Sequence, residues 1–495
     1  MGEPLSRRAF LRQAAGGMAI IGFNTRHDSW LTAADRPGSL AAGDVETPQF
    51  DGQLVTDEAA LDAAADDFGH IVHRRPMAVL RPGSVDDIVT LVRYARSHGI
   101  KVGARGQGHS TYGQAQVAAG VVVDLAYLNR IHEVNVTDAL VDAGVRWIDL
   151  LQETLLHGLT PPTLTDYIEL SVGGTLSVGG IGGQAFRSGT QTDNVLELQV
   201  VTGRGDLVTC ASTVQPELFH ACRAGLGQCG IIVGARVRLV PAPPLVRVYK
   251  ARYLDLGTFM ADQERLIDDG RFDYVEGSVE VKPGGGWWYV LETAKYYAPD
   301  HPPADLIMPA DLAYLPGTAT TEDQSYFDFA NRLAVLVAAL KALGWWDLPH
   351  PWLDLFIPAT SAVAFIANLL LHLDPKDVGD GPILIYPVNR ARCRTPLFRV
   401  PDERHFFLLA LLRFAKDPTD PTRYPTAERV QELIEANRRI YHDSTVVGSK
   451  RYPIDSVPME HADWAQHFDP LWDAFVAAKR YFDPDNILTP GQGIF

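Results

Sequence analysis

The residues with the clearest chemical potential lie in one short glycine-rich stretch, RGQGHSTYGQ at residues 105–114. It places a single histidine, His109, among glycine, glutamine and hydroxyl residues. On this stretch alone three interpretations are open: a turn with an incidental surface histidine, a loop that binds phosphate, or a point of covalent attachment. A neutral imidazole nitrogen is nucleophilic near pH 7, so the third interpretation would use His109 as the attacking group.

A second glycine-rich stretch, SVGGTLSVGGIGGQAF at residues 171–186, indicates what such loops could bind. Thr111 stands where the third glycine of G-x-G-x-x-G would be, and the sequence has no G-x-x-x-x-G-K-[ST] phosphate loop. Successive glycines still let backbone N–H groups surround an anionic group. Two such loops therefore predict a long ligand that carries phosphates, but not a nicotinamide bound in a Rossmann site.

Regular elements must position these loops. Strands are predicted at MAVLR, KVGARG and GVVVDL. A helix over VDDIVTLVRYARSHG, residues 85–99, is predicted to be capped by Ser84, with Asp87 three residues later. A hairpin is expected to turn at residues 203–206. After the proline-rich break at residues 241–244, a second α+β domain is predicted, with strands at FDYVEGSVEV, WWYVLETAKYY, PILIYPVN and HFFLLALLRF and helices at 326–343 and AERVQELIEANRRI. The final stretch reads as a helix and a turn-rich tail that packs somewhere specific.

Composition narrows the function. The chain has 495 residues, 46% of them hydrophobic, which is enough for two or three domains with a large core. Its formal net charge of −16 argues against nucleic acid or an anionic membrane as a partner, and no apolar run approaches the ~18 residues of a membrane span. The four cysteines lack zinc-site spacing, so buried or idle thiols and no metal are expected. A small molecule is the expected partner.

The N-terminus suggests export. SRRAFLRQAAGGMAIIGF places Arg7 and Arg8 before a short, weakly apolar segment, which is the layout of a twin-arginine signal. That route carries folded proteins, so it suits an enzyme that loads a cofactor in the cytoplasm. Residues 1–45 are therefore predicted to be a signal and a disordered linker, with the twin-arginine translocase as a transient partner and a periplasmic or extracellular destination.

An ordered set of motifs carries a family resemblance. ARGQGHSTYGQAQ, GVVVDL, the long segment from TLTDYIEL to GDLVTC, FDYVEGSV, LPHPWLDLFIP and FDPDNILTPGQGIF together resemble the cytokinin dehydrogenases, which are vanillyl-alcohol-oxidase-type flavoproteins. The resemblance spans about residues 50–495. It implies a two-domain α+β flavoprotein: a PCMH-type FAD-binding domain at 46–245, a substrate (cap) domain with an antiparallel sheet at 246–450, and a C-terminal segment at 451–495 that returns to the FAD domain.

The resemblance also implies the cofactor and how it is held. FAD would be linked through His109 to the 8α-methyl of the isoalloxazine, and only once, because residues 171–186 contain no cysteine for a second bond. Such a link would retain FAD outside the cytoplasm. The implied cofactor-binding residues are Arg105, Gly106, Gln107, Gly108, His109, Ser110, Gln114, Asp166, Tyr167, Gly173, Gly174, Ser177, Gly180, Gly182, Gly183, Ile232 and Gln492.

The implied reaction is oxidation of the N6 side-chain amine of a prenylated adenine to an imine, which water splits into adenine and an aldehyde. Asp166, in LTDY, matches the family's catalytic aspartate, and Glu276, in DYVEGS, matches the glutamate that helps hold the purine. The implied substrate-pocket residues are Leu333, Trp352, Asp354, Pro382 and Leu384. Asp354, where plant members commonly have asparagine, and Pro453 depart from the family pattern and could change which substrate fits.

Two other interpretations stay open. The same fold and FAD could oxidise another amine or an alcohol, although a purine-sized ligand would need two separated polar anchors, which Asp166 and Glu276 could supply. A non-catalytic flavin-binding protein is disfavoured because Asp166 is present. The sequence does not choose between oxygen and a quinone as electron acceptor.

Overall fold

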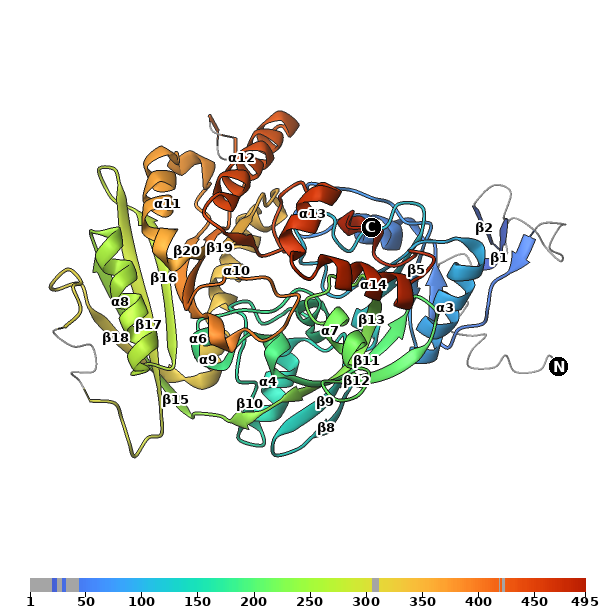
Figure 1. Ribbon diagram of the computed structural model, residues 1–495, viewed down its shortest axis with the longest axis horizontal. Coiled ribbons are helices and arrows are strands. Elements are labelled where there is room, and N and C mark those ends of the chain that lie inside the picture. Colours follow the sequence, from blue (N-terminus) through green and yellow to red (C-terminus); the bar gives the residue numbers. More distant parts are fainter. Residues whose placement is uncertain (1–19, 25–28, 33–43, 305–310, 418, 421–422) are drawn as a thin grey trace.

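The computed structural model describes residues 20–24, 29–32, 44–304, 311–417, 419–420 and 423–495. The chain forms two parts side by side: an N-terminal part that also contains the last helices, on the right of Figure 1, and a part built on one large sheet, on the left. The predicted twin-arginine pair, Arg7 and Arg8, lies outside the described residues.

The predicted linker is not without structure in the part of it that is described. Short strands β1 (Ile20–Asn24), β2 (Ser29–Thr32) and β3 (Asp44–Glu46) form a three-stranded antiparallel sheet in the order β2-β1-β3. The prediction rested on the Ala, Gly, Asp and Pro content of this region. It gave too little weight to Trp30 and Val45, residue types that favour strands.

The first glycine-rich stretch leaves the end of a small sheet ordered β4-β5-β7-β6. Strands β5, β7 and β6 run parallel, and β4 pairs antiparallel at one edge. Residues 106–120 connect β6 directly to its neighbour β7 with no helix between them. The elements of this sheet and its helices are β4 (Gln53–Val55), α2 (Glu58–Ala65), β5 (Ala78–Arg81), α3 (Val85–His98), β6 (Val102–Arg105) and β7 (Val121–Asp124), so the strands and helix predicted here are confirmed.

The start of α3 differs in detail from the predicted cap. Ser84 occupies the cap position, but its hydroxyl makes no capping bond. The carboxylate of Asp87 instead accepts the backbone N–H groups of Gly83, at 2.8 Å, and of Asp51 and Gly52, at 2.7 and 2.8 Å. In a capping box, Asp87 would accept the backbone N–H of Ser84, but here it accepts that of Gly83, one residue earlier. The Asp87 carboxylate is buried beside the segment that precedes β4. It therefore joins α3 to the segment at 51–52.

A second, antiparallel sheet ordered β12-β11-β13-β9-β8 completes the N-terminal part. The hairpin β11–β12 turns at residues 203–206, as predicted. The second glycine-rich stretch precedes this hairpin and contains the short helix α5. The elements here are β8 (Ile131–Val134), β9 (Asp138–Asp142), α4 (Trp147–Leu155), β10 (Leu159–Thr160), α5 (Val172–Leu176), α6 (Ala185–Ser188), β11 (Val195–Thr202), β12 (Leu207–Ala211), α7 (Pro216–Cys222), β13 (Gly230–Arg238) and β14 (Val240–Pro241).

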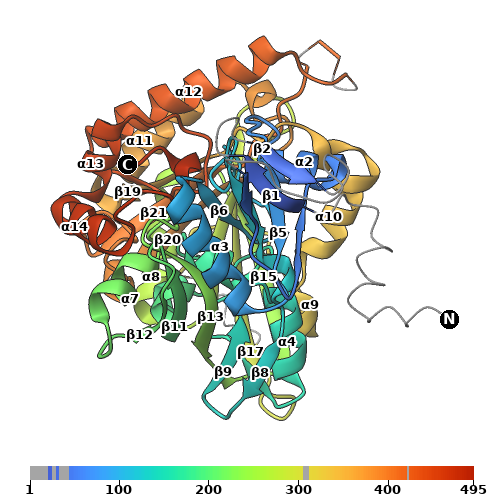
Figure 2. The same ribbon diagram turned by 90° about the vertical axis from the view of Figure 1, so that its right-hand side faces the viewer.

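The second part is an eight-stranded antiparallel sheet ordered β18-β15-β17-β16-β20-β21-β19-β22. Helices α8 and α11 cover one of its faces, and α12 runs along the top of the molecule (Figures 1 and 2). The elements are β15 (Leu245–Tyr253), α8 (Leu256–Asp269), β16 (Tyr274–Val281), β17 (Trp287–Tyr297), β18 (Thr320–Ser325), α9 (Tyr326–Ala330), α10 (Leu333–Ala342), β19 (Leu353–Pro358), α11 (Ala359–His372), β20 (Ile383–Asn389), β21 (His405–Leu411), α12 (Ala427–Thr445) and β22 (Lys450–Arg451).

Strand alternation divides this sheet into two faces. In β16, Val275 and Val279 belong to the core beneath α8 and α11, whereas Tyr274 belongs to the core shared with the N-terminal part. Successive side chains of a strand point to opposite faces, so Glu276 lies on the same side as Tyr274. The same alternation in β20 places Leu384 and Tyr386 on that side. The sheet thus presents a row of polar and aromatic side chains to the N-terminal part.

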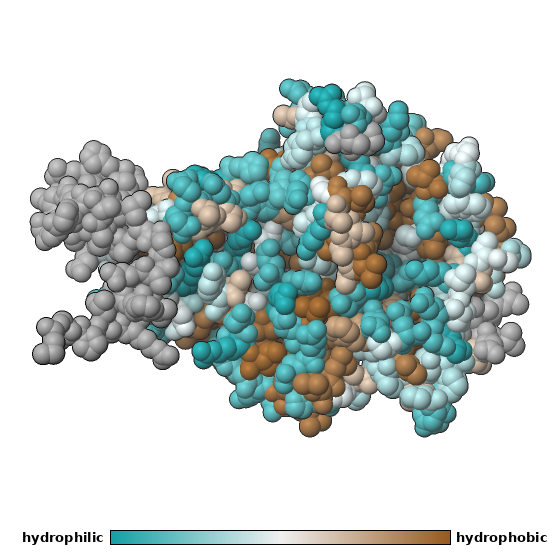
Figure 3. Space-filling model, turned by 180° about the vertical axis from the view of Figure 1, so that it is seen from behind, coloured by the Kyte–Doolittle hydropathy of each residue, from teal (hydrophilic) through white to brown (hydrophobic). Residues whose placement is uncertain are grey.

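The helix predicted at residues 326–343 is two helices. It breaks between α9 and α10, at Asn331 and Arg332. The sequence of α10 is apolar on more than one side, and Val335 and Leu343 remain 81% and 61% exposed. Apolar side chains therefore reach the surface as patches between hydrophilic ones, as the reverse face in Figure 3 shows.

The C-terminal segment packs on the N-terminal part. Helices α13 (His461–Phe468) and α14 (Trp472–Phe482) precede a tail whose Ile487 and Thr489 form backbone hydrogen bonds with Val102 of β6, at 2.8 Å each. All four cysteines are buried and unpaired. None of the helices described here has the length and apolar character needed to cross a membrane.

Candidate active site

The two glycine-rich stretches lie against each other. A Cβ atom on Gly106 would stand 2.0 Å from the Ser171 hydroxyl oxygen, so only glycine allows this approach. Gly108 has a φ of 66°, in the left-handed region, and a Cβ there would overlap the Arg105 guanidinium. The two loops therefore approach each other so closely at Gly106 that a side chain has no room there.

The second stretch also touches the large sheet. A Cβ on Gly183 would lie 2.5 Å from the Tyr274 ring, and the Val275 backbone N–H donates to the Gly183 carbonyl at 3.0 Å. Gly182 packs as closely on the Leu164 carbonyl, and Gly173 on Ala143. Gly183 thus brings the N-terminal part into contact with β16, while Gly182 and Gly173 allow close packing within the N-terminal part.

Aromatic rings surround His109. Its imidazole stacks on Phe68, with ring centroids 4.0 Å apart and planes 24° from parallel. The Tyr167 centroid lies 4.9 Å away, and the Trp352 ring meets the imidazole edge-on at 5.8 Å. His350 stacks on the other side of Phe68 at 3.9 Å, so Phe68 is held between two imidazoles.

Backbone contacts fix this stack. The Phe68 N–H donates to the Gly108 carbonyl at 2.8 Å, and the His350 N–H donates to the Gly69 carbonyl at 2.9 Å. The buried carboxylate of Asp67 accepts from the backbone N–H groups of Gly69 and Gly113. The segment 67–69 therefore ties the first glycine-rich loop to the HPWL motif.

His109 is held neutral. Burial, reinforced by the positive charge of Lys341, lowers the pKa of His109 to about 3. Neither of its ring nitrogens has a hydrogen-bond partner among the described residues. An uncharged imidazole with an uncommitted nitrogen is the form that can act as a nucleophile.

The two predicted acids meet at one tyrosine and one arginine. The Tyr274 hydroxyl contacts Asp166 Oδ1, at 2.9 Å, and Glu276 Oε2. Arg332 Nη2 contacts the same two oxygens, at 2.6 and 3.3 Å, and also the Tyr274 hydroxyl. The sequence suggested two separated anchors, but the structure joins Asp166 and Glu276 in one cluster. It does so because β16 presents Tyr274 and Glu276 on the face that Asp166 approaches.

Each acid has one carboxylate oxygen without a partner in the described chain. The hydrogen bonds and ion pairs of Asp166 all involve Oδ1, and those of Glu276 all involve Oε2, within the described chain. The side chains are 20% and 10% exposed. Burial, followed by the neighbouring charge of Asp166, raises the pKa of Glu276 well above its usual range. Burial therefore favours the protonated form of Glu276 at this site.

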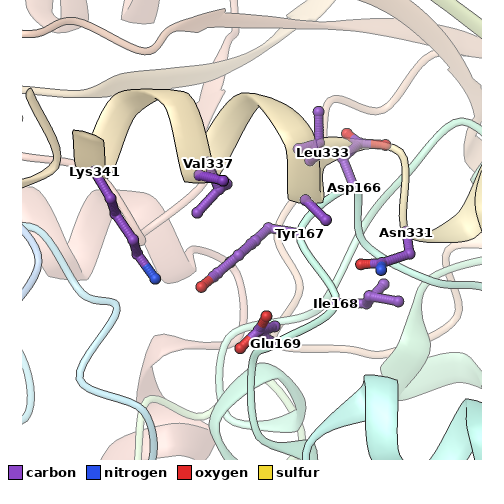
Figure 4. A pocket seen from close by; sticks show the side chains of 10 residues that line it. Asp166, Tyr167, Ile168, Glu169, Asn331, Leu333, Val337 and Lys341 are labelled. Carbon is purple, nitrogen blue, oxygen red and sulfur yellow. The ribbon is translucent and has the colours of Figure 1, made fainter. Parts of the chain in front are cut away.

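A pocket of about 180 Å³ opens beside Asp166, between residues 166–169 and helix α10. Figure 4 shows Tyr167 extending along α10 toward Lys341, with Asp166 and Leu333 at the other end. Apolar side chains of α10 form one wall, and the residues of the LTDY motif form the other. The lining residues are Asp166, Tyr167, Ile168, Glu169, Asn331, Leu333, Ala334, Val337, Ala338 and Lys341.

The residues predicted to line the substrate pocket do not all lie together. Leu333 lines the pocket, and Trp352 lies beside His109 instead. Leu384 is half-buried in β20, opposite Ser278 of β16. Pro382 is exposed just before β20.

Asp354 is buried in β19 near a second acid. Its backbone N–H donates to the Asp455 carboxylate at 3.3 Å, and its own Oδ2 is buried without a hydrogen bond within the described chain. Burial, reinforced by the charge of Asp455, raises the pKa of Asp354 well above its usual range. Both effects favour the protonated form of Asp354 over the charged one.

Most of the remaining predicted cofactor residues make contacts within the protein. The side-chain amide of Gln114 accepts a hydrogen bond from the Tyr112 N–H and donates one to the Asp455 carbonyl. Ile232 is buried in β13, and the Ser177 hydroxyl donates to the Gly173 carbonyl. Gln492 lies in the turn Pro490–Gln492, which packs on the first glycine-rich loop through Gly491. Gln107 is exposed on that loop, and Ser110 donates to Asp67.

Sequence reasoning missed Phe68, His350, Tyr274 and Arg332 as site residues. His350 and Tyr274 stand inside the quoted motifs HPWL and DYVEGS, which is a signal that could have found them. Phe68 and Arg332 belong to no motif, and only the fold brings them to the site.

The residues present fit FAD. Both amide atoms of Gln191, Oε1 of Gln184 and Nε1 of Trp352 are buried without a hydrogen-bond partner within the described chain. Gln191 lies beside Gly180, whose φ of 72° belongs to the left-handed region. Unsatisfied buried polar atoms next to a glycine surface are what a polar ligand would complete. FAD would be held by the two glycine-rich stretches, with His109 at one end of the surface.

The fold and this site define an FAD-dependent oxidoreductase. A family profile described as "FAD binding domain" matches residues 76–211, and one described as "Cytokinin dehydrogenase 1, FAD and cytokinin binding" matches residues 282–495. The chain belongs to the cytokinin dehydrogenase family, whose members act on CH–NH donors, and its substrate is a small molecule.

Comparisons with individual proteins support the same family. The chain is 41% identical to "Uncharacterized oxidoreductase ORF5 in fasciation locus" of Rhodococcoides fascians, over 88% of this chain and 97% of that protein. It is 38% identical to cytokinin dehydrogenase 2 of Arabidopsis thaliana, over 89% and 93%. The crystal structure of 6-hydroxy-D-nicotine oxidase from Arthrobacter nicotinovorans has the same fold, with a TM-score of 0.68 at 24% identity over 91% of this chain and 98% of that one.

Proposed function

We propose that this enzyme oxidises the N6 side-chain secondary amine of prenylated adenines to an imine, which water splits into adenine and an aldehyde. The observation that carries this proposal is the pair of acids, Asp166 and Glu276, fixed through one oxygen each and free at the other. A prenylated adenine offers two N–H groups, one on the N6 amine and one on the imidazole part of the purine ring, one for each free oxygen. The names of the cytokinin dehydrogenases among its relatives support the same substrate class.

The side chains have distinct roles in this reaction. Asp166 Oδ2 accepts the hydrogen of the substrate amine and takes its proton as the C–H bond breaks. Glu276 Oε1 anchors the purine, and the apolar wall of α10, with Leu333 and Val337, contacts the prenyl chain. Bound FAD supplies the acceptor for the hydride that leaves the carbon, and oxygen or a quinone then removes the electrons.

The attachment of FAD is part of this proposal. A single bond from His109 to the flavin 8α-methyl is supported by the neutral imidazole, by its uncommitted nitrogens and by the Phe68 stack that fixes the ring. The four cysteines are all buried outside residues 171–186, which supports a single bond.

The test of the substrate is anaerobic mixing with isopentenyl-adenine. We expect the yellow colour of oxidised flavin to disappear and adenine and the prenyl aldehyde to form in equal amounts after turnover. Loss of colour with a polyamine or an alcohol, but not with isopentenyl-adenine, would instead identify a flavoenzyme with another substrate. No loss of colour with any compound would indicate a flavin-binding protein without this activity.

Export through the twin-arginine route is also proposed, on the basis of Arg7 and Arg8. Replacing both with lysine removes the paired guanidinium groups while it keeps the charge, so folded, FAD-loaded protein should accumulate in the cytoplasm. Cell fractionation with a flavin fluorescence readout measures this. Export of the double variant at the level of the parent would contradict the proposal.

A further inference from the structure

One hydroxyl group joins the two acids of the site. The Tyr274 hydroxyl contacts Asp166 Oδ1 and Glu276 Oε2, and it carries one hydrogen, so it cannot donate to both carboxylates at once. Both contacts between Tyr274 and the acids are satisfied if Glu276 carries a proton and donates to Tyr274, while Tyr274 donates to Asp166. The geometry therefore matches two acids that hold one proton between them.

Arg332 is the cation of this pair. Its Nη2 contacts both acids, and its Nε lies 3.4 Å from Glu292 Oε1. Glu292 has a cation of its own, because its Oε2 lies 2.7 Å from Lys250 Nζ. The single positive charge of Arg332 is thus left to balance Asp166 and Glu276. It balances the pair best if the two acids together carry one negative charge rather than two.

We propose that Asp166 and Glu276 share one proton through the Tyr274 hydroxyl, and that Arg332 keeps a single negative charge on the pair. Tyr274 and Arg332 are then positioning residues for the oxidation. The pair has room for one further proton, and this is the proton that the amine nitrogen loses while the hydride passes to FAD. The inference rests on the proposed function, since it assigns the proton acceptor of that reaction to a pair.

The groups that face the pair come from several elements. They are Tyr274 on β16, Glu292 and Tyr296 on β17, Tyr386 on β20, and Arg332 between α9 and α10. Burial raises the pKa of Tyr274, Tyr296 and Tyr386 well above their usual range, so these phenols stay neutral. Near neutral pH, the charge of the pair therefore depends on its own protons and on Arg332.

The test is the pH profile of flavin reduction by isopentenyl-adenine. In Arg332→Gln the pair loses its cation, so it keeps a second proton up to a higher pH. The acid limb of the profile, where the rate falls at low pH, should therefore shift to higher pH by roughly 1 to 3 pH units. Tyr274→Phe should move it in the same direction by less, and Arg332→Lys should keep it near its original position. At high pH the rates should return to within several-fold of the parent.

Tyr326→Phe is the matched control, because it removes a buried hydroxyl that contacts Thr160 rather than an acid. Its acid limb should not move. Calorimetry in buffers of different ionisation enthalpy measures the proton uptake that accompanies adenine binding. In the Arg332 and Tyr274 variants, the pH dependence of this uptake should shift in the same direction as the acid limb of the rate profile.

An acid limb that stays in place in Tyr274→Phe and Arg332→Gln, or a rate that falls equally at every pH, would overturn the shared proton. The proposed function would survive that result if Asp166→Asn still slowed reduction. An Asp166→Asn enzyme with the parent rate would remove the shared proton and the role of Asp166 as proton acceptor, whereas a parent enzyme whose flavin is not reduced by isopentenyl-adenine would remove the proposed function.

Discussion

Asp166→Asn is expected to slow flavin reduction by isopentenyl-adenine by a factor of ~10² to 10⁴, while FAD stays bound. Asparagine keeps a side-chain oxygen for Tyr274 and Arg332, so the cluster can stay assembled, but it removes the group that takes the amine proton. The loss corresponds to ~3 to 5 kcal/mol of transition-state stabilisation. Stopped-flow reduction across substrate concentrations separates the limiting rate from the apparent substrate affinity.

Glu276→Gln is the matched control for this prediction. Glutamine resembles the protonated form of Glu276, so it should weaken substrate binding more than it slows reduction. Equal losses of rate in the two variants would contradict the separate roles given to the acids, and a parent-like rate in Asp166→Asn would contradict its role as proton acceptor.

His109→Ala is expected to abolish acid-stable flavin. After precipitation with acid, the parent protein should remain yellow and the variant should release its FAD into the supernatant. The reason is that His109 stands within the first glycine-rich stretch and has a neutral imidazole whose nitrogens have no hydrogen-bond partner among the described residues. His372→Ala, which removes an exposed histidine of α11, is the control and should stay yellow. Release of FAD from the parent by acid would show that the attachment is not covalent.

The sequence predicted those parts of the fold that have a strong local pattern. The β11–β12 hairpin, helix α3 and strands β16, β17, β20 and β21 were all expected, because alternation or helical spacing marks them. Strand β18 could not be predicted. Its sequence TTEDQS is polar and mostly exposed, so only its pairing with β15 makes it a strand. Helix α11 is apolar over much of its circumference, which removes the usual amphipathic signal.

The site was predictable only in part. The glycine-rich loops, His109, Asp166 and Glu276 stand in recognisable motifs, and the structure brings Asp166 and Glu276 together. Arg332 could not be found, because its position depends on the break between α9 and α10 within a segment that reads as one helix. The junction of the two acids was also hidden, since Asp166 and Glu276 come from different parts of the molecule and meet only across the face of the large sheet.

The most direct measurement of the central claim is anaerobic stopped-flow reduction of the purified, FAD-loaded enzyme by a panel of isopentenyl-adenine, aromatic cytokinins, polyamines, alcohols and sugars. Isopentenyl-adenine should reduce the flavin fastest, with a rate that saturates with concentration, and the Asp166→Asn variant should lose that rate. A flavin that stays oxidised with every N6-substituted adenine, but is reduced by another member of the panel, would contradict the account.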